Sequence, residues 1–431
     1  MNRELVVLLG GHRVGRVRQD EKGNLRMQYE QAWRDDPTAY PLSLSLPLAR
    51  REHGEPEVRA FLENLLPDSE AILRSWGRRF GVSARNPFAL LEHVGEDVAG
   101  AAQFLTPDRL ERLAASERPA VRWLTEADVA ERLRRLREDR SAWRSSDDPG
   151  YFSLAGAQAK TALLFEDDRW GVPQGRLATS HILKPPMEGL DGVVENEHTC
   201  LQLAKAVGLP AASSTVRRFE DEIAIVVTRY DRVLVGGDLE RIHQEDMCQA
   251  LGIRPVDKYE NDGGPGAVAI LRLLAEQSAD AREDIRTFVR AIAFNWAIGA
   301  PDAHGKNYSL LLAPGSEVRL APLYDLITAL PYPEQFYPPK MKLAMRIGGE
   351  YRLAHVARRH WQRLAESADL DPTEVLELVD EVCERVSSRL APVCEAVRSA
   401  GIEHDVIDAI EAQVAARLER CMRALESRDA G

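Results

Sequence analysis

An aspartate and an asparagine five positions apart, in the segment Asp302-Ala-His-Gly-Lys-Asn307, carry the clearest chemical signal of this sequence. The D-x-x-x-x-N spacing is that of a kinase catalytic loop. In such a loop the aspartate accepts the proton of a substrate hydroxyl and the asparagine oxygen holds Mg²⁺. Asp and Asn are also common in ordinary loops, because both turn and cap the backbone. The spacing therefore predicts phosphoryl transfer only if the chain supplies the other parts of such a site.

A second aspartate and a strand lysine are candidates for those parts. Asp325 follows a predicted hairpin, where kinases place their second metal-binding carboxylate; a helix cap is the simpler interpretation of one isolated aspartate. Lys184 ends a short predicted strand and could bind nucleotide phosphates, or it could be a solvated edge lysine. The next predicted helix contains Glu195 and Glu197. We favour Glu197 as the ion-pair partner of Lys184.

Two further segments stand where a kinase binds its nucleotide. The small residues of 153–160 would let backbone N–H groups approach phosphates, although the segment has a single glycine and could equally be a plain β-turn. The residues predicted to cover the phosphates are Ala155, Gly156, Ala157, Gln158, Ala159 and Lys160. Thr228, Arg229 and Tyr230 end the last predicted strand of this region. They are expected to form an adenine-binding hinge, or only to pack between lobes.

His304 and Lys306 lie inside the D-x-x-x-x-N loop. A histidine can act as a general base, but Asp302 already has that position, so we expect His304 to order the loop near the nucleotide. Lys306 could neutralise the γ-phosphate in the transition state, or it could be a solvent lysine.

Hydrophobic periodicity predicts a β-rich start, a strand-rich middle and a helical end. The predicted strands cover 4–9, 12–18, 25–30, 40–48, 152–157, 160–165, 170–172, 181–184, 214–219, 223–230, 308–312 and 317–320. The predicted helices cover 57–66, 68–80, 195–207, 244–251, 265–277, 281–298, 353–367, 372–398 and 404–426, with one more that Thr125 and Asp128 cap and that ends at Arg140.

These elements predict an α+β, bilobed, protein-kinase-like fold in three parts. The parts are a β-rich N-terminal subdomain with helices (1–145), a small lobe (150–231) and a helical large lobe (232–431), with a linker at 145–150. Small-residue loop, strand lysine, helix glutamate, hinge, D-x-x-x-x-N and aspartate follow one another in kinase order. Agreement among several weak signals raises the odds of the whole set above those of any one.

Composition limits the other classes of function. The 431 residues carry a net charge of −12, which argues against a self-sufficient nucleic-acid binder and suits a basic partner. No stretch of about 18 uncharged apolar residues predicts a membrane span, and the N-terminal apolar run is too short for a signal peptide. Five scattered cysteines without a C-x-x-C pair argue against a zinc site or disulfides. A cytoplasmic location is expected.

Several long strings resemble the HipA family, the serine/threonine-kinase toxins of type II toxin–antitoxin modules. They lie at 152–164, 181–184, 244–249, 258–266 and 302–307, and the segments 42–48 and 61–68 resemble the N-terminal subdomain of that family. The resemblance covers nearly the whole chain.

The resemblance implies a role for each matching residue. Asp302 would be the catalytic base, Asn307 and Asp325 would hold Mg²⁺, and Lys184 would bind ATP phosphates. Residues 154–160 would form the phosphate loop. Ser153 would be the autophosphorylation site that silences the kinase, since added negative charge repels the nucleotide and disfavours the buried loop. The sequence departs from the expected pattern at Ala159, where an acidic residue is expected, and at Thr228, where some relatives have Glu.

The resemblance also implies partners and a biological role. The family's substrates are aminoacyl-tRNA synthetases, glutamyl-tRNA synthetase above all, and their phosphorylation leads to growth arrest and persistence. The partner is a HipB-like helix-turn-helix antitoxin that joins the toxin to operator DNA. Two alternatives stay open: a catalytically idle co-repressor that acts with its antitoxin, and a small-molecule kinase of the aminoglycoside or choline type.

Overall fold

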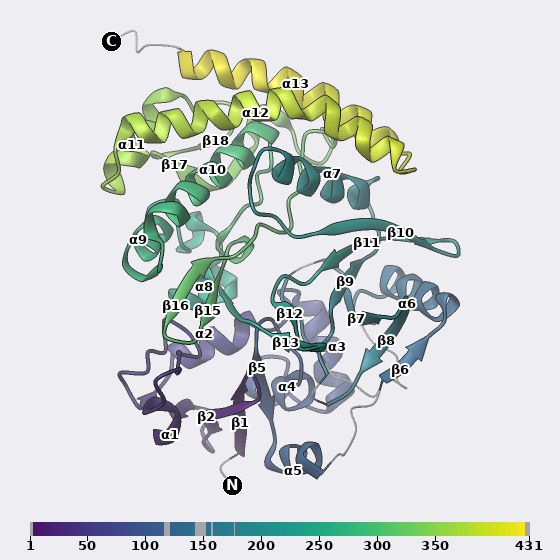
Figure 1. Cartoon of the computed structure of the whole chain (residues 1–431), viewed down its shortest axis with the longest axis vertical. Helices are drawn as coiled ribbons and strands as arrows, with labels where there is room; N and C mark the ends of the chain where they lie inside the picture. Colours follow the sequence, from purple (N-terminus) through teal and green to yellow (C-terminus); the bar gives the residue numbers. More distant parts are fainter. Residues whose placement is uncertain (1–2, 116–120, 143–151, 157, 176, 427–431) are drawn as a thin grey trace. The chain divides into compact units, whose positions relative to one another are not determined.

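The computed structural model describes residues 3–115, 121–142, 152–156, 158–175 and 177–426 (Figure 1). The chain forms two compact units, and each is described by itself. The first comprises Met1–Pro185, Arg217–Val256 and Ser309–Val318, and the second comprises Pro186–Val216, Asp257–Tyr308 and Arg319–Gly431. The predicted linker at 145–150 lies outside the described residues. The three-part division at 145, 150 and 231 stays a prediction.

The first unit begins with a five-stranded antiparallel sheet in the order β4-β3-β2-β1-β5. Its strands are β1 (Arg3–Leu9), β2 (His12–Gln19), β3 (Leu25–Tyr29), β4 (Glu52–His53) and β5 (Ala102–Leu105). Its helices are α1 (Gln31–Arg34), α2 (Glu57–Asn64), α3 (Glu70–Phe80), α4 (Pro87–Val94) and α5 (Pro107–Ala115). Alternation of apolar and polar residues correctly predicted β2 and β3, because side chains of a strand point alternately to the two faces of a sheet. Strand β1 was predicted from its apolar run, which is buried from Leu5 to Leu9.

The predicted strand at 40–48 is wrong, because this segment is a series of turns. Its serines bond locally and to a distant element instead of to a neighbouring strand. The Ser43 hydroxyl accepts the backbone N–H of Ser45 at 3.1 Å, and the Ser45 hydroxyl donates to the carbonyl of Gln249 at 2.8 Å. Short hydroxyl side chains compete with β-ladders in this way.

A six-stranded sheet in the order β10-β11-β9-β7-β8-β6 forms the middle of the chain. Its strands are β6 (Val121–Leu124), β7 (Thr161–Glu166), β8 (Arg169–Pro173), β9 (His181–Lys184), β10 (Ser214–Phe219) and β11 (Glu222–Thr228). Helix α6 (Glu126–Glu138) packs on it through Val129 and Leu133, which join a buried core with Leu163, Leu183 and Val226. The predicted capping box of Thr125 and Asp128 is confirmed.

Smaller strands complete the first unit. Strands β12 (Arg232–Val235) and β13 (Asp238–Arg241) form a hairpin, and β14 (His243–Asp246), β15 (Ser309–Ala313) and β16 (Glu317–Leu320) form a three-stranded sheet. The predicted helix at 244–251 is wrong in its first half. Residues 243–246 pair with β15, and only α8 (Met247–Ala250) is helical, beginning at a capping box of Asp246 and Gln249.

A buried cluster of charged residues joins segments of the first unit that are far apart in the sequence. Asp97 accepts hydrogen bonds from Arg232 at 2.8 Å and from the Thr179 hydroxyl at 2.7 Å, and Arg229 forms an ion pair with it at 3.5 Å. Arg229 also donates to Asp231 at 2.8 Å. Burial alone would raise the pKa of Asp97, but the surrounding guanidinium groups outweigh it and hold that pKa far below its usual range.

A buried carboxyl group ties the turns at 43–45 to β14. Glu245 accepts hydrogen bonds from the Ser43 hydroxyl and from the backbone N–H of Leu44, the latter at 2.9 Å. Burial, only partly offset by these bonds, raises the pKa of Glu245 to about 8. The native protein therefore binds a proton here that the unfolded chain releases near pH 4.5.

This group gives the protein a pH-dependent stability. Because Glu245 is protonated in the native state but not in the unfolded state between about pH 4.5 and 8, we expect its contribution to the free energy of unfolding to fall as the pH rises through this window. Glu245→Gln keeps the shape without a titrating proton and should remove that contribution. Urea unfolding of both proteins at about pH 5, 7 and 8.5 measures it. If the free energy of unfolding changed with pH equally in the wild type and in Glu245→Gln, Glu245 would not be the titrating group.

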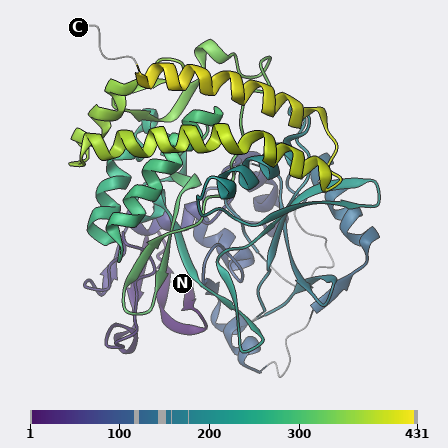
Figure 2. The same ribbon diagram turned by 45° about the horizontal axis from the view of Figure 1, so that its top comes forward.

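The second unit is mainly helical, with α7 (Val193–Ala206), α9 (Ala267–Gln277), α10 (Ala281–Ile298), α11 (Arg358–Ser367), α12 (Pro372–Ser399) and α13 (Asp405–Glu426). The long helices α12 and α13 lie side by side (Figures 1 and 2). Strands β17 (Lys342–Ile347) and β18 (Glu350–Arg352) form a hairpin, and short 3₁₀ turns occupy Pro255–Asp257, Glu260–Asp262, Gly305–Asn307 and Pro338–Lys340. The prediction of α10 is confirmed at both ends, since Asp280 caps its start and Gly299 its end.

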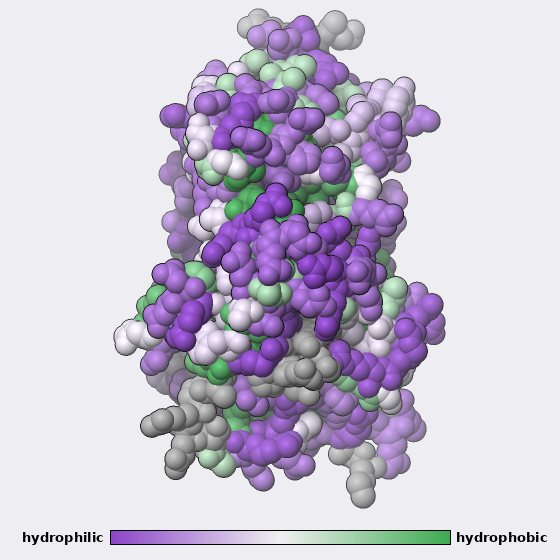
Figure 3. Space-filling model, turned by 90° about the vertical axis from the view of Figure 1, so that its right-hand side faces the viewer, coloured by the Kyte–Doolittle hydropathy of each residue, from purple (hydrophilic) through white to green (hydrophobic). Residues whose placement is uncertain are grey.

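Hydrophilic residues dominate the face drawn in Figure 3, where hydrophobic ones appear in small groups. Within the part of the chain that the structure describes, no helix has the length and apolarity to cross a membrane.

Candidate active site

The D-x-x-x-x-N loop leaves the end of α10 and is ordered by its own hydrogen bonds. The His304 backbone N–H donates to the carbonyl of Asp302 at 2.9 Å, and the Asn307 N–H donates to the carbonyl of His304 at 2.9 Å. The ring nitrogen Nδ1 of His304 accepts the N–H of Lys306 at 3.3 Å. The buried His304 thus fastens the loop from within, while Asp302 is exposed.

Asn307 and Asp325 meet in the second unit. The Asn307 amide nitrogen donates to Asp325 Oδ2 at 3.4 Å. The amide nitrogen faces Asp325, and the amide oxygen, Oδ1, is buried with no hydrogen-bond partner among the described residues. A buried carbonyl oxygen without a donor is costly. A bound cation would relieve that cost.

The two metal-binding candidates share one cavity with the proposed base. Asp302, Asn307 and Asp325 line a cavity of about 70 Å³, together with Asn295 and Tyr308. The Asn295 amide donates to the Tyr308 hydroxyl at 2.8 Å. Sequence reasoning assigned no role to these last two residues, whose apolar surroundings gave no signal of a site.

Asp325 has a backbone conformation that is unusual for a residue with a side chain. Its φ of +58° lies in the left-handed region, which aspartate tolerates at some cost. The neighbouring residues hold it there. The Leu323 N–H donates to the carbonyl of Pro210 at 2.8 Å, and the Tyr324 hydroxyl donates to the carbonyl of Lys306 at 2.7 Å. The second bond joins the Asp325 segment to the D-x-x-x-x-N loop.

The donor set fits Mg²⁺ bound together with a nucleotide. Among the described residues, no group of three or more His, Cys, Asp or Glu side chains is placed to bind a metal ion. Asn307 and Asp325 offer amide and carboxylate oxygens, the ligands that Mg²⁺ takes when phosphate oxygens and waters complete its shell.

In the first unit, the 152–160 segment leads directly into β7. Strand β7 pairs with β9, with Thr161 opposite Leu183, so the end of the segment lies beside Lys184. The Lys184 side chain is buried. The pairing therefore brings together the predicted phosphate loop and the predicted phosphate-binding lysine.

The predicted strand at 152–157 is wrong, because the segment is a loop that bonds to the N-terminal subdomain. The Ser153 N–H donates to the carbonyl of Asp97 at 2.9 Å, and the Asp68 N–H donates to the carbonyl of Gly156 at 3.2 Å. The Lys160 ammonium group donates to the carbonyl of Ala155 at 2.7 Å and closes the loop. Ala157 lies outside the described residues.

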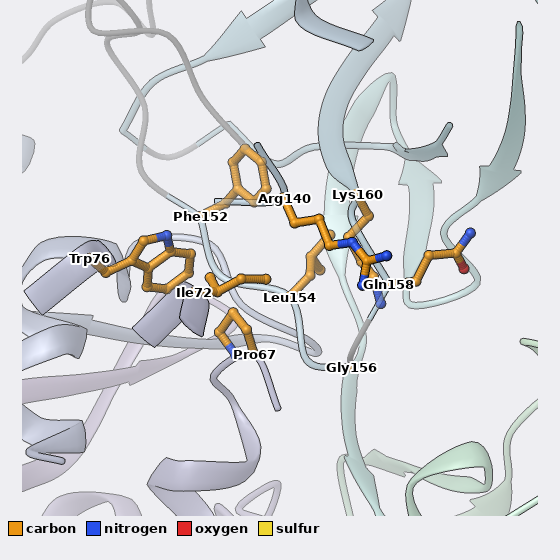
Figure 4. A pocket seen from close by; sticks show the side chains of 9 residues that line it. All are labelled: Pro67, Ile72, Trp76, Arg140, Phe152, Leu154, Gly156, Gln158 and Lys160. Carbon is orange, nitrogen blue, oxygen red and sulfur yellow. The ribbon is translucent and has the colours of Figure 1, made fainter. Parts of the chain in front are cut away.

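Gly156 is required by this closure. Its φ is +106°, and a Cβ there would come within 2.6 Å of the Lys160 nitrogen. Figure 4 shows Ile72 and Trp76 of α3 on one side of the loop and Gln158 on the other, around a small pocket. Ala159 is buried.

Ser153 is sequestered at the start of the loop. Its side chain is 1% exposed, and its hydroxyl donates to the carbonyl of Leu65 at 2.8 Å. In this conformation the hydroxyl cannot reach a phosphoryl donor in solution.

The predicted hinge residues have different environments. Thr228 is exposed at the end of β11. The side chain of Arg229 is committed to the buried charged cluster with Asp97 and Asp231, and its backbone N–H donates to the carbonyl of Ser180 at 2.9 Å. The Tyr230 hydroxyl donates to the side chain of Gln244. Glu197 is buried in α7 of the second unit, and its pairing with Lys184 stays a prediction.

Comparisons with known proteins agree on one family. The HipA-like C-terminal domain matches residues 152–390, and the HipA N-terminal domain matches residues 5–105. The chain is 38% identical over 410 residues to the Sinorhizobium fredii protein Y4mE, which is provisionally named a kinase; the match covers 93% of this chain and 96% of Y4mE.

A relative with a defined activity is the serine/threonine-protein kinase toxin HipA of Shewanella oneidensis. It is 31% identical over 359 residues, which cover 80% of this chain and 78% of that protein. A structure of the Shewanella oneidensis HipA–HipB–operator DNA complex contains a chain that superposes with a TM-score of 0.83 at 25% identity, covering 97% of both chains. The α+β kinase-like fold predicted from the sequence is confirmed by this likeness. The chain therefore belongs to the HipA family.

Proposed function

We propose that this chain is an ATP- and Mg²⁺-dependent serine/threonine protein kinase and the toxin of a toxin–antitoxin module. The observation that carries the proposal is the shared cavity of Asp302, Asn307 and Asp325, with the buried Asn307 Oδ1 that lacks a donor among the described residues. Membership of the HipA family supports the kinase class.

Each residue has a task in phosphoryl transfer. Asp302 accepts the proton of a serine or threonine hydroxyl as its oxygen bonds to the γ-phosphorus, and the bond to the ADP leaving group breaks. Asn307 and Asp325 hold the metal, which neutralises charge on the phosphates when bound. Lys184 and the backbone of 154–160 bind the phosphates, and Lys306 stabilises the developing charge.

Ser153 is the proposed autophosphorylation site, and its surroundings explain how the modification would act. A phosphoryl group on Oγ removes the hydrogen that Ser153 donates to Leu65 and places about two negative charges against a carbonyl oxygen. The loop must leave its buried site for the reaction, and the modified side chain cannot return to it. Phosphorylation would thus remove the phosphate loop and silence the enzyme.

Ser153→Ala tests this assignment. Incubated with MgATP, the wild type should gain a phosphoryl group on the peptide that contains Ser153, and the variant should gain none there and keep its activity for longer. Mass spectrometry and a time course of transfer measure both. Ser214→Ala, which removes another buried hydroxyl that bonds to His198, should behave as wild type. Undiminished self-labelling of Ser153→Ala would rule out the site.

Asn307→Ala tests the metal site. Removal of an oxygen ligand should raise the Mg²⁺ concentration for half-maximal activity by about tenfold or more, as losses around metal ligands do. The melting temperature without nucleotide should change little, because the single hydrogen bond of this amide to Asp325 is long. An unchanged Mg²⁺ dependence would exclude Asn307 as a ligand.

A partner and a substrate are proposed as well. A HipB-like helix-turn-helix antitoxin is the proposed partner, since a structurally similar chain is found in a complex with HipB and operator DNA, and the net charge of −12 suits a basic partner. The proposed substrate is an aminoacyl-tRNA synthetase such as glutamyl-tRNA synthetase, whose modification would arrest growth. Phosphoproteomics after induction tests it, because a synthetase site should appear only with active protein.

A further inference from the structure

A glycine-rich segment of the second unit packs against the D-x-x-x-x-N loop. It runs from 257 to 266 with the sequence Asp-Lys-Tyr-Glu-Asn-Asp-Gly-Gly-Pro-Gly. The Tyr259 hydroxyl donates to Asp302 Oδ1 at 2.8 Å. The Tyr259 ring stands edge-on to the His304 ring, with centroids 5.0 Å apart, and the carbonyl of Lys258 accepts the N–H of Gly305 at 3.3 Å. The segment thus contacts the loop at three successive points.

The segment is built tightly around the backbone of Tyr259. The carbonyl of Tyr259 accepts the N–H groups of Asp262 and Gly264, both at 2.9 Å. Gly263 has a φ of +103°, and a Cβ on Gly264 would lie 2.1 Å from the carbonyl of Asp257, so neither position accepts a larger residue. Tyr259 is therefore placed before any substrate binds.

The next residue anchors this segment to β17. Glu260 accepts the backbone N–H of Arg346 at 2.7 Å and pairs with its guanidinium group at 2.8 Å. Gly266 is packed so closely that a Cβ would lie 2.2 Å from the Glu260 carboxylate. Strand β17 also bonds to the start of the catalytic loop, since the Ala344 N–H donates to the carbonyl of Pro301 at 2.8 Å. Tyr259 and Asp302 thus share one rigid support.

We propose that Tyr259 is a positioning residue that fixes the carboxylate of Asp302, an inference that rests on the proposed kinase function. The side chain of Asp302 is exposed, and the terminal torsion of an aspartate is broad. A hydrogen bond to Oδ1 from a rigidly held hydroxyl sets the rotation of the carboxylate, and so sets where Oδ2 meets the substrate hydroxyl. Such alignment determines how often the reacting groups adopt an attack geometry.

The 257–266 segment thus serves to place Tyr259 against Asp302. His304 supports it as well, because its ring packs on that of Tyr259 while its Nδ1 holds the loop. Tyr259 touches neither nucleotide nor the reacting phosphorus in this account; it acts through Asp302.

Tyr259→Phe tests the role, because it removes the hydroxyl and keeps the ring against His304. We expect kcat to fall about tenfold to hundredfold, the effect of losing one hydrogen bond to a charged group, with KM for ATP and melting temperature unchanged. Tyr332→Phe is the matched control, since the Tyr332 hydroxyl accepts a hydrogen bond from the Asn196 amide at 3.3 Å; it should keep the wild-type kcat.

A double-mutant cycle separates positioning from general support of the fold. In an Asp302→Ala background, where no carboxylate remains to be oriented, Tyr259→Phe should have no further effect on the residual rate. Equal losses in both backgrounds would overturn the proposal, and so would a wild-type kcat for Tyr259→Phe in an active kinase. A wild type without any transfer from ATP would overturn both this inference and the kinase function.

Discussion

Asp302→Asn should lower the rate of phosphoryl transfer at least about a hundredfold, the usual contribution of a positioned general base. The amide keeps the shape of the side chain and can still accept the hydrogen bond of Tyr259, but it cannot take a proton from serine or threonine. Since Asp302 is exposed, the substitution should leave the melting temperature unchanged. Initial rates of transfer from labelled ATP to protein measure the effect.

The same variant should bind nucleotide as the wild type does, because the proposed phosphate and metal ligands are Lys184, Asn307 and Asp325. Glu52→Gln, on an exposed ion pair of the first unit, serves as a control and should transfer at the wild-type rate. A rate for Asp302→Asn within a factor of two or so of the wild type would contradict the assignment of Asp302 as the base.

Asp97→Ala should lower the free energy of unfolding by about 3–5 kcal/mol, the typical cost of removing one partner from a buried ion pair. It leaves the buried guanidinium groups of Arg229 and Arg232 with one carboxylate, that of Asp231, in place of two. It also removes the acceptor of the Thr179 hydroxyl. Urea unfolding followed by circular dichroism measures the loss.

The loss in free energy of unfolding depends on whether the ion pair is buried, so an exposed ion pair is the proper control. Glu52→Ala breaks the bridge between Glu52 and Arg26, whose side chains are 47% and 70% exposed, and should cost no more than about 1 kcal/mol. If Asp97→Ala were as mild as Glu52→Ala, the buried guanidinium groups would not need the carboxylate of Asp97, and the role given to the charged cluster would be wrong.

Local pattern predicted much of the fold, because most elements bury one face. The helices α10, α12 and α13 were predicted closely, because their apolar stripes, and for α10 and α12 also their N-caps, depend on residues that are near one another in the sequence. The segment at 40–48 alternates as a strand does and failed, because its serines bond to Gln249 and Glu245, about two hundred positions away. No local pattern contains such a partner.

The candidate site, too, was predicted from the sequence only in part. Asp302, Asn307 and Asp325 were predicted from spacing and order, and the structure places all three in one cavity. The contact of Tyr259 with Asp302 was not predicted. The two residues are 43 positions apart, and no sequence motif links a tyrosine at this position to the catalytic loop. Arg229 was assigned to a hinge, whereas its side chain serves the charged cluster around Asp97, whose members come from segments far apart in sequence.

Phosphoamino-acid analysis tests most directly whether this chain transfers the γ-phosphate of ATP to a serine or threonine of a protein. Wild-type protein, with Asp302→Asn beside it, is incubated with MgATP labelled in its γ-phosphate and a bacterial lysate. We predict phosphoserine or phosphothreonine in protein with the wild type only. Label that enters only small molecules would favour a small-molecule kinase, label in neither would favour an idle co-repressor, and either result would contradict the proposed function.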